Sequence, residues 1–290
     1  MECSMSDTSL SEEARLFLRR NAASDQSTLP DASNIGFLRK QAREEYRRAF
    51  ESAQNKHTQS IQDVSIGGVD CMQINPKYRD QKKGDVVMLY LFGGGYILGS
   101  PEEDLPISAA ISNKLGIRSI CPRYRLAPEH PFPAALEDAS AVYRALLDEH
   151  DNGHIVVVGE SAGGHLALQT TLRASTDGIR LPTACALLSP WADISMSGDS
   201  VDFNDGRDPT LSVSLVARAA QMFAPNVNHC DQTVSPLFAD YSMGFPPTFI
   251  STGTRDLLMS SAIRLATKMR HANIEVTLTV VYPEVCNLFL

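Results

Sequence analysis

The spacing of hydrophobic and polar residues changes along the chain. Residues 9–20 and 34–52 place apolar side chains at helical spacing between charged ones, and a loop rich in Ser, Asp, Asn and Pro separates the two segments. From Ile61, the runs "IQDVSI" and "VDCMQINP" flank Gly67-Gly68 and predict two strands paired around a tight turn. The pattern therefore predicts helices first and a sheet afterwards.

Beyond residue 84, short apolar runs alternate with helix-like segments. The predicted strands are residues 85–92, 116–122, 154–159, 183–190, 247–253 and 275–282. The predicted helices are about residues 104–115, 135–149, 161–175, 212–223 and 257–272. This alternation is typical of βαβ units, so we expect an α/β fold with a mostly parallel sheet flanked by helices.

The predicted elements also divide the chain. We expect residues 1–52 to form a helical cap and residues 53–290 to form the α/β core. Residues of about 191–241 interrupt the alternation with turns and one helix, so we interpret them as an insertion over the edge of the sheet. Active sites of such sheets lie beyond the carboxyl ends of the strands, where the motifs described below fall.

Composition narrows the classes of partner. The 290-residue chain carries a net charge of −8, which argues against a nucleic-acid or anionic-membrane surface. It has no run of about 20 apolar residues, and its polar, acidic N-terminus resembles neither a signal peptide nor a transit peptide, so we expect a cytoplasmic protein without a membrane span. The six cysteines are isolated, which predicts free thiols and no metal site.

The segment Gly159-Glu160-Ser161-Ala162-Gly163 fits the pattern G-x-S-x-G between a predicted strand and a predicted helix. A sharp strand-to-helix turn would strain the backbone of Ser161 and present its hydroxyl at the helix N-terminus. The N–H of Ala162 would then point to where an oxyanion forms. The alternative is a plain glycine-rich turn between strand and helix.

Three consecutive glycines follow the predicted strand 85–92, in the segment "FGGGY" at residues 92–96. They leave the backbone N–H groups unobstructed, which suits an oxyanion hole with Gly94 and Gly95 as donors. A nucleotide phosphate loop is the rival interpretation, but G-x-G-x-x-G and G-K-[ST] are both absent. A purely structural turn is the other alternative.

Together with "RYRLAPEHPFPAALEDA" (residues 123–139) and "SPLFADYSMGFPPTFISTGTRD" (residues 235–256), these motifs resemble the hormone-sensitive-lipase family of α/β-hydrolases over about residues 35–285. The resemblance implies an eight-stranded, mostly parallel sheet and a cap built largely from the N-terminal helices. It also implies an oxyanion hole from the amides of Gly94, Gly95 and Ala162, with no metal or organic cofactor. The family's glycine loop usually opens with histidine, and Phe92 stands in that position here. Because the oxyanion-hole donors are backbone amides, this departure leaves them in place.

The resemblance assigns the acid of a catalytic triad to Asp256, just past the predicted strand 247–253. Taken alone, Asp256 could equally be a helix N-cap. The family's histidine lies one helix and one strand further on, in a turn that corresponds here to residues 283–289. Asn287 occupies its position. Because an asparagine side chain cannot take up a proton near neutral pH, the triad is incomplete.

No other histidine is expected to replace the missing base. His165 lies one turn into the nucleophile's helix and is expected to point away from the hydroxyl. At about 1.5 Å per residue, His271 would lie about 22 Å from Asp256 along the same predicted helix. The remaining histidines match no active-site position of the family: His57, His130, His150, His154 and His229, of which His229 is the least unsuitable.

Three functional classes follow from this combination. The first, which we favour, is a serine hydrolase that cleaves a small, uncharged carboxylic ester or lactone through an acyl-enzyme on Ser161, with its activity impaired by Asn287. The second is a ligand-binding pseudoenzyme, and the third is a lyase or cyclase that uses the same pocket. We leave open whether the chain forms a homodimer.

The last residues of the chain carry a further expectation. In the family a final helix follows the histidine turn and covers one face of the sheet, whereas this chain stops at Leu290. We expect that helix to be missing and the segment "VCNLFL" to be a truncated ending. A genuine replacement of histidine by asparagine is the alternative, because Asn287-Leu288-Phe289 keeps the family's H-x-F spacing at its phenylalanine.

Overall fold

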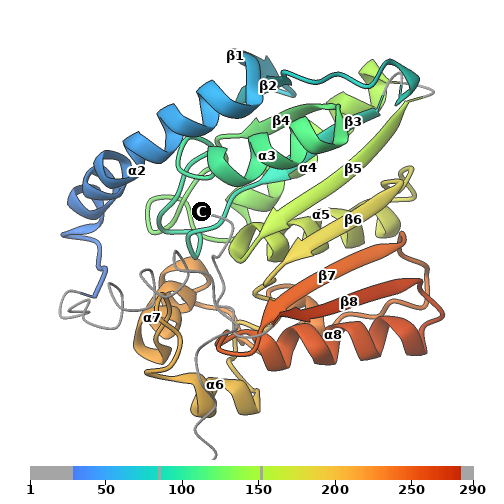
Figure 1. Ribbon diagram of the computed structural model, residues 1–290. Coiled ribbons are helices and arrows are strands. Elements are labelled where there is room, and N and C mark those ends of the chain that lie inside the picture. Colours follow the sequence, from blue (N-terminus) through green and yellow to red (C-terminus); the bar gives the residue numbers. More distant parts are fainter. Residues whose placement is uncertain (1–28, 84–85, 151–152, 282–290) are drawn as a thin grey trace, which may run out of the picture.

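A single mixed sheet organises the protein. The computed structural model describes residues 29–83, 86–150 and 153–281. Its eight strands are β1 (Thr58–Ile66), β2 (Val69–Pro76), β3 (Val86–Leu91), β4 (Arg118–Pro122), β5 (His154–Glu160), β6 (Ala184–Leu188), β7 (Thr248–Gly253) and β8 (Val276–Val281). They lie in the order β1-β2-β4-β3-β5-β6-β7-β8, antiparallel from β1 to β4 and parallel from β4 onward (Figure 1).

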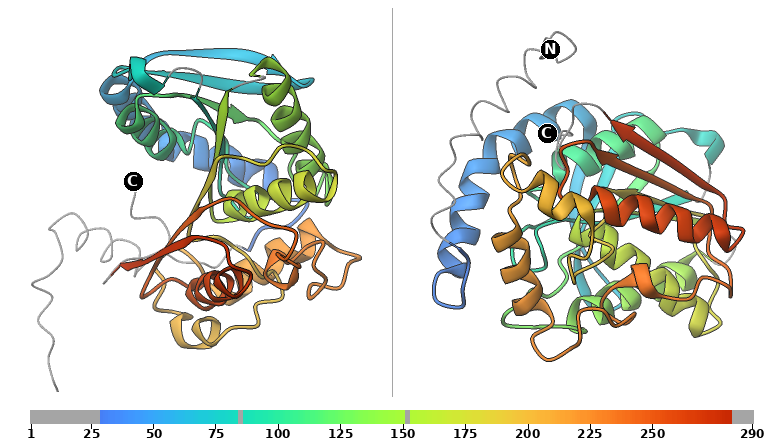
Figure 2. Two further views of the ribbon diagram at one scale, coloured as in Figure 1. Left: turned by 90° about the vertical axis from the view of Figure 1, so that its right-hand side faces the viewer. Right: turned by 90° about the horizontal axis from the view of Figure 1, so that it is seen from below.

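Helices cover both faces of this sheet. They are α2 (Ile35–His57), α3 (Leu105–Leu115), α4 (Ala134–Glu149), α5 (Ala162–Thr176), α6 (Asp199–Asn204), α7 (Val213–Phe223) and α8 (Met259–His271), with 3-10 turns η2 (Gln81–Lys83) and η3 (Pro236–Phe238). Helix α3 packs on β2 and β4 and carries α2 on its outer side, whereas α4, α5 and α8 pack on the other face (Figures 1 and 2). The fold is thus the expected α/β arrangement, with a mostly parallel, eight-stranded sheet.

The central strands are buried because both of their faces are covered. Residues 87–91 of β3 are all fully buried, which explains why β3 is a continuous apolar run in the sequence. The hairpin of β1 and β2 turns at Gly67-Gly68, as predicted. The strands and most helices occur where expected, with boundaries that differ by a few residues. Helix α2 runs five residues further than its predicted end, to His57.

The segment 191–241 holds two helices where one was predicted. Helix α6 has only six residues, too few for a helical hydrophobic repeat to be recognised. Helix α7 has buried Val216, Ala219 and Phe223 on one face, at the predicted spacing. Both helices lie near the carboxyl ends of the parallel strands (Figure 1), so this segment closes one side of the region where the motifs meet.

Some predictions lie outside the described residues. These are the helix over 9–20, residues 1–28 of the cap expected over 1–52, and the histidine turn with the segment that follows it. Helix α2, the described part of the expected cap, packs on α3 and β1. Within the described ranges, no helix combines the length and the apolar character needed to cross a bilayer.

An apolar groove of about 540 Å³ lies over β5 to β8, on the sheet face that α3 shares. Ile111 of α3, Val156 of β5, Ala186 of β6 and Phe249 of β7 are among its lining residues. Phe249 is 38% exposed, whereas its neighbours Thr248 and Ile250 point to the covered face and are buried. The prediction that the family's final helix is missing concerns the end of the chain, outside the described residues, and stays a prediction.

Arg39 connects α2 to the loops that carry the glycine motif. Its guanidinium donates to the carbonyl oxygens of Ile97 (2.8 Å) and Ala127 (2.7 Å) and forms a two-pronged ion pair with Glu129 (2.8 and 2.9 Å). The Ala127 N–H in turn donates to the Tyr96 oxygen at 2.9 Å. One side chain therefore fixes the helix against two loops that are themselves joined.

We expect Arg39→Met to lower the free energy of unfolding by about 2 kcal/mol, because hydrogen bonds to charged groups typically contribute about 1.5–3 kcal/mol. The matched control is Arg47→Met on the same helix. The Arg47 side chain is 60% exposed and, among the described residues, pairs with Glu44 and Glu51 on its own helix, so its loss should change stability by less than about 0.5 kcal/mol. Urea denaturation measures the stability of both variants. Equal losses of stability would contradict the conclusion that Arg39 fixes α2 against the two loops.

Candidate active site

Ser161 lies at the turn between β5 and α5 with a strained backbone. Its φ of 51° and ψ of −115° fall in a region that residues with a side chain rarely adopt. Its N–H donates to the Leu188 oxygen at 2.9 Å, and its carbonyl accepts from His165 and Trp191, both at 3.0 Å. These bonds hold the serine in the conformation that a nucleophile elbow requires.

The glycines of this turn are required by close packing. A Cβ on Gly159 would lie 2.2 Å from the Gly163 oxygen, and one on Gly163 would lie 2.0 Å from the Leu91 oxygen. Both distances are far inside van der Waals contact, and both involve backbone atoms that cannot move aside. The G-x-S-x-G pattern therefore marks a steric constraint of this turn.

The glycine loop after β3 approaches the same place. Phe92 stacks on Tyr124 with ring centroids 4.0 Å apart, so an aromatic contact takes the place of the family's histidine. Gly94 has a φ of 110°, and its carbonyl accepts from Ile97 (3.2 Å) and Leu98 (2.9 Å) in a tight turn. Within the described residues, the Gly94 and Gly95 N–H groups donate no hydrogen bond. Both donors are thus free to bind a ligand.

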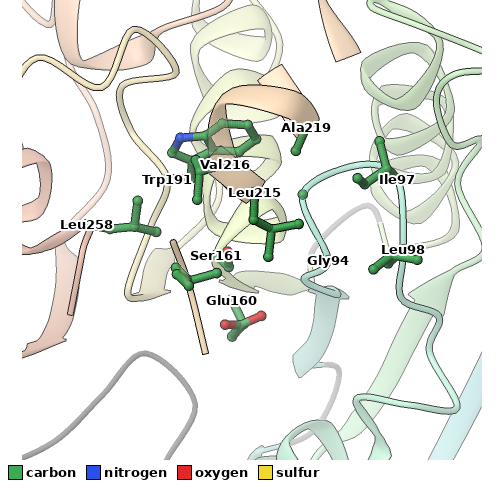
Figure 3. Close-up of a pocket in the computed structure, with 12 residues that line it drawn as sticks. Gly94, Ile97, Leu98, Glu160, Ser161, Trp191, Leu215, Val216, Ala219 and Leu258 are labelled. Carbon is green, nitrogen blue, oxygen red and sulfur yellow. The ribbon is translucent and has the colours of Figure 1, made fainter. Parts of the chain in front are cut away.

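A cavity of about 160 Å³ brings the two motifs together. Figure 3 shows Ser161 and Gly94 at its wall, with Trp191 and the side chains of α7 closing another side. Its lining residues are Gly94, Gly95, Ile97, Leu98, Glu160, Ser161, Trp191, Leu211, Leu215, Val216, Ala219 and Leu258. Nearly all of these are apolar, so the cavity suits a small uncharged group.

Asp256 is fully buried at the carboxyl end of β7. Its Oδ2 accepts from the hydroxyls of Ser189 (2.6 Å) and Thr252 (2.7 Å), and its Oδ1 accepts the Leu258 N–H at 2.8 Å. Burial raises the pKa of Asp256, and these three donors oppose that rise. The N-cap residue of α8 is Leu258 and not Asp256, so the N-cap alternative is wrong. The Asp256 Oδ1 instead stabilises the turn before α8, and its second oxygen is occupied by hydroxyl groups.

The end of β6 links Asp256 to Ser161. The Leu188 oxygen accepts the Ser161 N–H, and the next residue, Ser189, donates its hydroxyl to Asp256. Leu258, two residues beyond Asp256, lines the same cavity as Ser161. Asp256 itself does not line that cavity. Asn287 lies outside the described residues, so its predicted place beside Asp256 stays a prediction.

His165 cannot act as a base for Ser161, because both of its ring nitrogens have partners. Nδ1 bonds to the Tyr96 hydroxyl at 2.5 Å, and Nε2 bonds to the Val234 oxygen at 2.9 Å. The ring lies in an aromatic cluster with Trp191 and Phe223. Burial lowers the pKa of His165 to about 4, which keeps the ring neutral.

The two other histidines considered as replacements also lie away from the cavity. His229 bonds through Nε2 to the Ala224 oxygen at 3.1 Å and does not line the cavity. His271 is the last residue of α8 and is exposed. Among the described residues, no cluster of His, Cys, Asp and Glu side chains could hold a metal ion.

The sequence did not single out the acidic groups behind the glycine loop. Asp104, before α3, accepts the Gly93 N–H at 3.1 Å, and the Glu160 carboxyl lies so close to Gly93 that a Cβ there would be 1.7 Å away. Both carboxyls line a second cavity of about 170 Å³ on the far side of the loop, together with Tyr46 of α2. Burial raises the pKa of Asp104 to about 6. An isolated aspartate eleven residues after Gly93 carries no recognisable sequence signal.

Asp208, in the segment that contains α6 and α7, was also missed. One of its oxygens accepts the Leu257 N–H at 2.9 Å, directly after Asp256, and the other accepts from Thr210 and Leu211. Asp208 is buried, and its charge helps to raise the pKa of Asp256. The segment 191–241 therefore supports the turn that holds Asp256.

We expect the His165 ring to stay neutral from pH 8 down to about pH 5, because its pKa of about 4 lies well below the usual 6.5. Its ring proton and carbon shifts in NMR spectra should therefore not change over that range, whereas added imidazole titrates. The unfolded chain gains this proton near pH 6.5, so stability should fall as the pH is lowered from 6.5 through 4. His165→Gln should weaken that dependence, and a titration of His165 near pH 6.5 would contradict the buried geometry.

Comparison with known proteins assigns the chain to the family that its sequence motifs resemble. The model of the alpha/beta hydrolase fold matches residues 88–290. An acetyl-hydrolase of Streptomyces hygroscopicus is 32% identical over 80% of this chain and 76% of its own length.

Two crystal structures are also similar. One, of an esterase/lipase from an uncultured bacterium, superposes with a TM-score of 0.82 at 27% identity over 96% of this chain and 90% of its own. The other, a hormone-sensitive lipase from a metagenome library, gives a TM-score of 0.81 at 27% identity over 94% and 89%. The chain belongs to the hormone-sensitive-lipase family of α/β-hydrolases, a family of carboxylic ester hydrolases.

Proposed function

We propose that this protein is a carboxylesterase that uses Ser161 as its nucleophile and cleaves a small, uncharged carboxylic ester or lactone. The observation that carries the proposal is the shared cavity, which the strained Ser161, Gly94 and Gly95 all line, the two glycine N–H groups having no acceptor among the described residues. The pseudoenzyme and lyase alternatives offer no reason for a strained serine at this point.

In the proposed reaction, the Ser161 oxygen attacks the ester carbonyl and forms a tetrahedral intermediate. The carbonyl oxygen, now negatively charged, accepts hydrogen bonds from Gly94, Gly95 and Ala162. Ala162 is the first residue of α5, so its N–H has no acceptor within the helix. As the intermediate collapses, its C–O bond to the alcohol breaks and the leaving oxygen takes up a proton, which replaces the one lost from Ser161. This releases the alcohol, or opens the lactone, and leaves an acyl-enzyme. Water then hydrolyses the acyl-enzyme to the carboxylic acid and restores the Ser161 hydroxyl.

The step that this site supports least is the removal of the Ser161 proton. A base must take the Ser161 proton as the new bond forms, and Asp256 would orient it. The family resemblance gives the base position to Asn287, which cannot accept that proton. Removing the histidine of such a triad lowers kcat on the order of 10⁶-fold in a serine protease, while the remaining groups retain about 10³–10⁴-fold over water. We therefore propose an impaired esterase.

The size and polarity of the cavity limit the substrate. At about 160 Å³, with apolar walls from Trp191, Leu215 and Ala219, it admits a short acyl group and no charged one. The similarity to an acetyl-hydrolase supports this short chain length. A ligand-binding role without turnover is the second candidate, and Asn287 is the observation that favours it.

The first prediction concerns the rate of the chain as it stands. Short p-nitrophenyl esters should be hydrolysed several orders of magnitude more slowly than the usual turnover of about 1–10³ s⁻¹. Acetylated Ser161 should be detectable by mass spectrometry after incubation with p-nitrophenyl acetate, and Ser161→Ala should abolish it. Ordinary turnover that depends on Ser161 would show that another base is present, and binding of the ester without any acyl-enzyme would favour the second candidate.

The second prediction is a gain of activity. Asn287→His should raise kcat by at least about 10²-fold, because it supplies a group that takes up the Ser161 proton. Asn287→Gln is the matched control, since it changes size and flexibility and adds no base. If Asn287→His and Asn287→Gln hydrolyse p-nitrophenyl acetate equally fast, position 287 does not hold the base.

A further inference from the structure

The peptide unit that joins Phe92 to Gly93 is held at both of its polar ends. The Tyr124 hydroxyl donates to the Phe92 oxygen at 2.7 Å, and the Gly93 N–H donates to Oδ2 of Asp104 at 3.1 Å. The next N–H along the chain is that of Gly94, a residue that lines the Ser161 cavity. The orientation of one peptide unit restricts that of the next, so these two bonds influence where the Gly94 N–H points.

Residues 93–95 are glycines, so they have no side chains whose packing could position this part of the loop. A Cβ on Gly93 would collide with the Glu160 carboxyl, and one on Gly94 would lie 2.3 Å from the Leu98 oxygen. On the far side of the loop, the second cavity leaves about 170 Å³ of space beside Gly93 and Gly94. The glycines therefore have room to shift away from Ser161. The stacked rings of Phe92 and Tyr96 fix the two ends of the loop, and between them hydrogen bonds to the backbone oppose that shift.

Asp104 is itself held by hydrogen bonds, but they are not the ones expected from its position at the start of α3. It stands at the N-cap of α3, where an aspartate usually accepts N–H groups of the first helical turn, yet its side chain makes no such bond. Its Oδ2 instead accepts from Gly93 and from the Tyr90 hydroxyl, the latter at 2.9 Å. The carboxyl thus makes no capping bond to α3 and accepts the N–H of Gly93 in the glycine loop instead.

We propose that Asp104 is a positioning residue of the oxyanion hole, whose carboxyl holds the Gly93 amide so that the Gly94 and Gly95 N–H groups point toward the carbonyl oxygen bound at Ser161. This inference rests on the proposed esterase function. Asp104 touches no reacting atom and acts only through the glycine loop. Oxyanion donors must lie about 2.7–3.1 Å from the developing charge, and loss of one donor costs about 10²–10³-fold in kcat.

The test compares three variants in single-turnover acetylation by p-nitrophenyl acetate, in the unaltered chain and in the Asn287→His chain. Asp104→Ala should lower the acetylation rate constant about 10–10³-fold with little change in KM, because the loop is no longer held. Asp104→Asn retains an oxygen acceptor of the same shape and should stay within about threefold of the parent. Glu103→Gln, a buried neighbour whose carboxyl accepts from Ser100 and not from the loop, should have no effect.

A Ser161→Ala arm separates the two hypotheses. If Ser161→Ala reacts as fast as the parent, the proposed esterase function fails. If the reaction requires Ser161 and a folded Asp104→Ala variant keeps the parental rate, the positioning role fails. An Asp104→Asn variant as slow as Asp104→Ala also overturns it, since the acceptor would then not be what matters.

A measurement on the unaltered protein covers the case in which Asp104→Ala does not fold. The Gly93 amide should be protected from hydrogen exchange in NMR spectra, because it is bonded to a held carboxyl group. Rapid exchange of the Gly93 amide in the folded chain would overturn the proposal without any variant.

Discussion

Ser161 is held at φ 51° and ψ −115°, and much of the surrounding structure serves to keep it there. Such backbone conformations cost about 1–3 kcal/mol and persist only where neighbouring contacts outweigh the cost. Here the Ser161 N–H and carbonyl are bonded to β6, to the first turn of α5 and to Trp191. The carboxyl ends of β3, β5, β6 and β7 therefore converge on one residue, and their spacing sets the distance between the nucleophile, the glycine loop and Asp256.

The acidic groups near this point are stabilised by neutral donors. Asp256 is surrounded by two hydroxyls and one amide, and Asp104 by one hydroxyl and one amide. In the described part of the chain neither carboxyl pairs with Lys or Arg, and burial raises the pKa of both. Hydroxyl and amide dipoles fix the orientation of a carboxyl without bringing a full positive charge next to the cavity. Such a charge would change the electrostatic field that a bound ester experiences.

Local patterns in the sequence predicted most of the fold and about half of the candidate site. Strand β3 was recognisable because its residues are buried on both faces, and the glycines around Ser161 because close packing demands them. Helix α6 was missed because six residues are too few for a helical repeat. Asp104 and Asp208 could not be found, since their partners are reached through the path of the chain in space. The family resemblance, not the local pattern, was needed to choose between a helix cap and a catalytic role for Asp256, and the geometry shows its carboxyl stabilising the turn before α8 while also binding two hydroxyls.

The close packing of the glycines has an evolutionary consequence. A side chain on Gly93, Gly94, Gly159 or Gly163 would meet a carboxyl or backbone oxygen at 1.7–2.3 Å, whether or not the protein still turns over a substrate. Selection for folding alone would thus preserve these positions in a lineage that had abandoned catalysis. The glycine signature is consequently a record of the fold's ancestry. The identity of residue 287 bears on proton transfer, so it reports more directly on whether the chemistry has been kept.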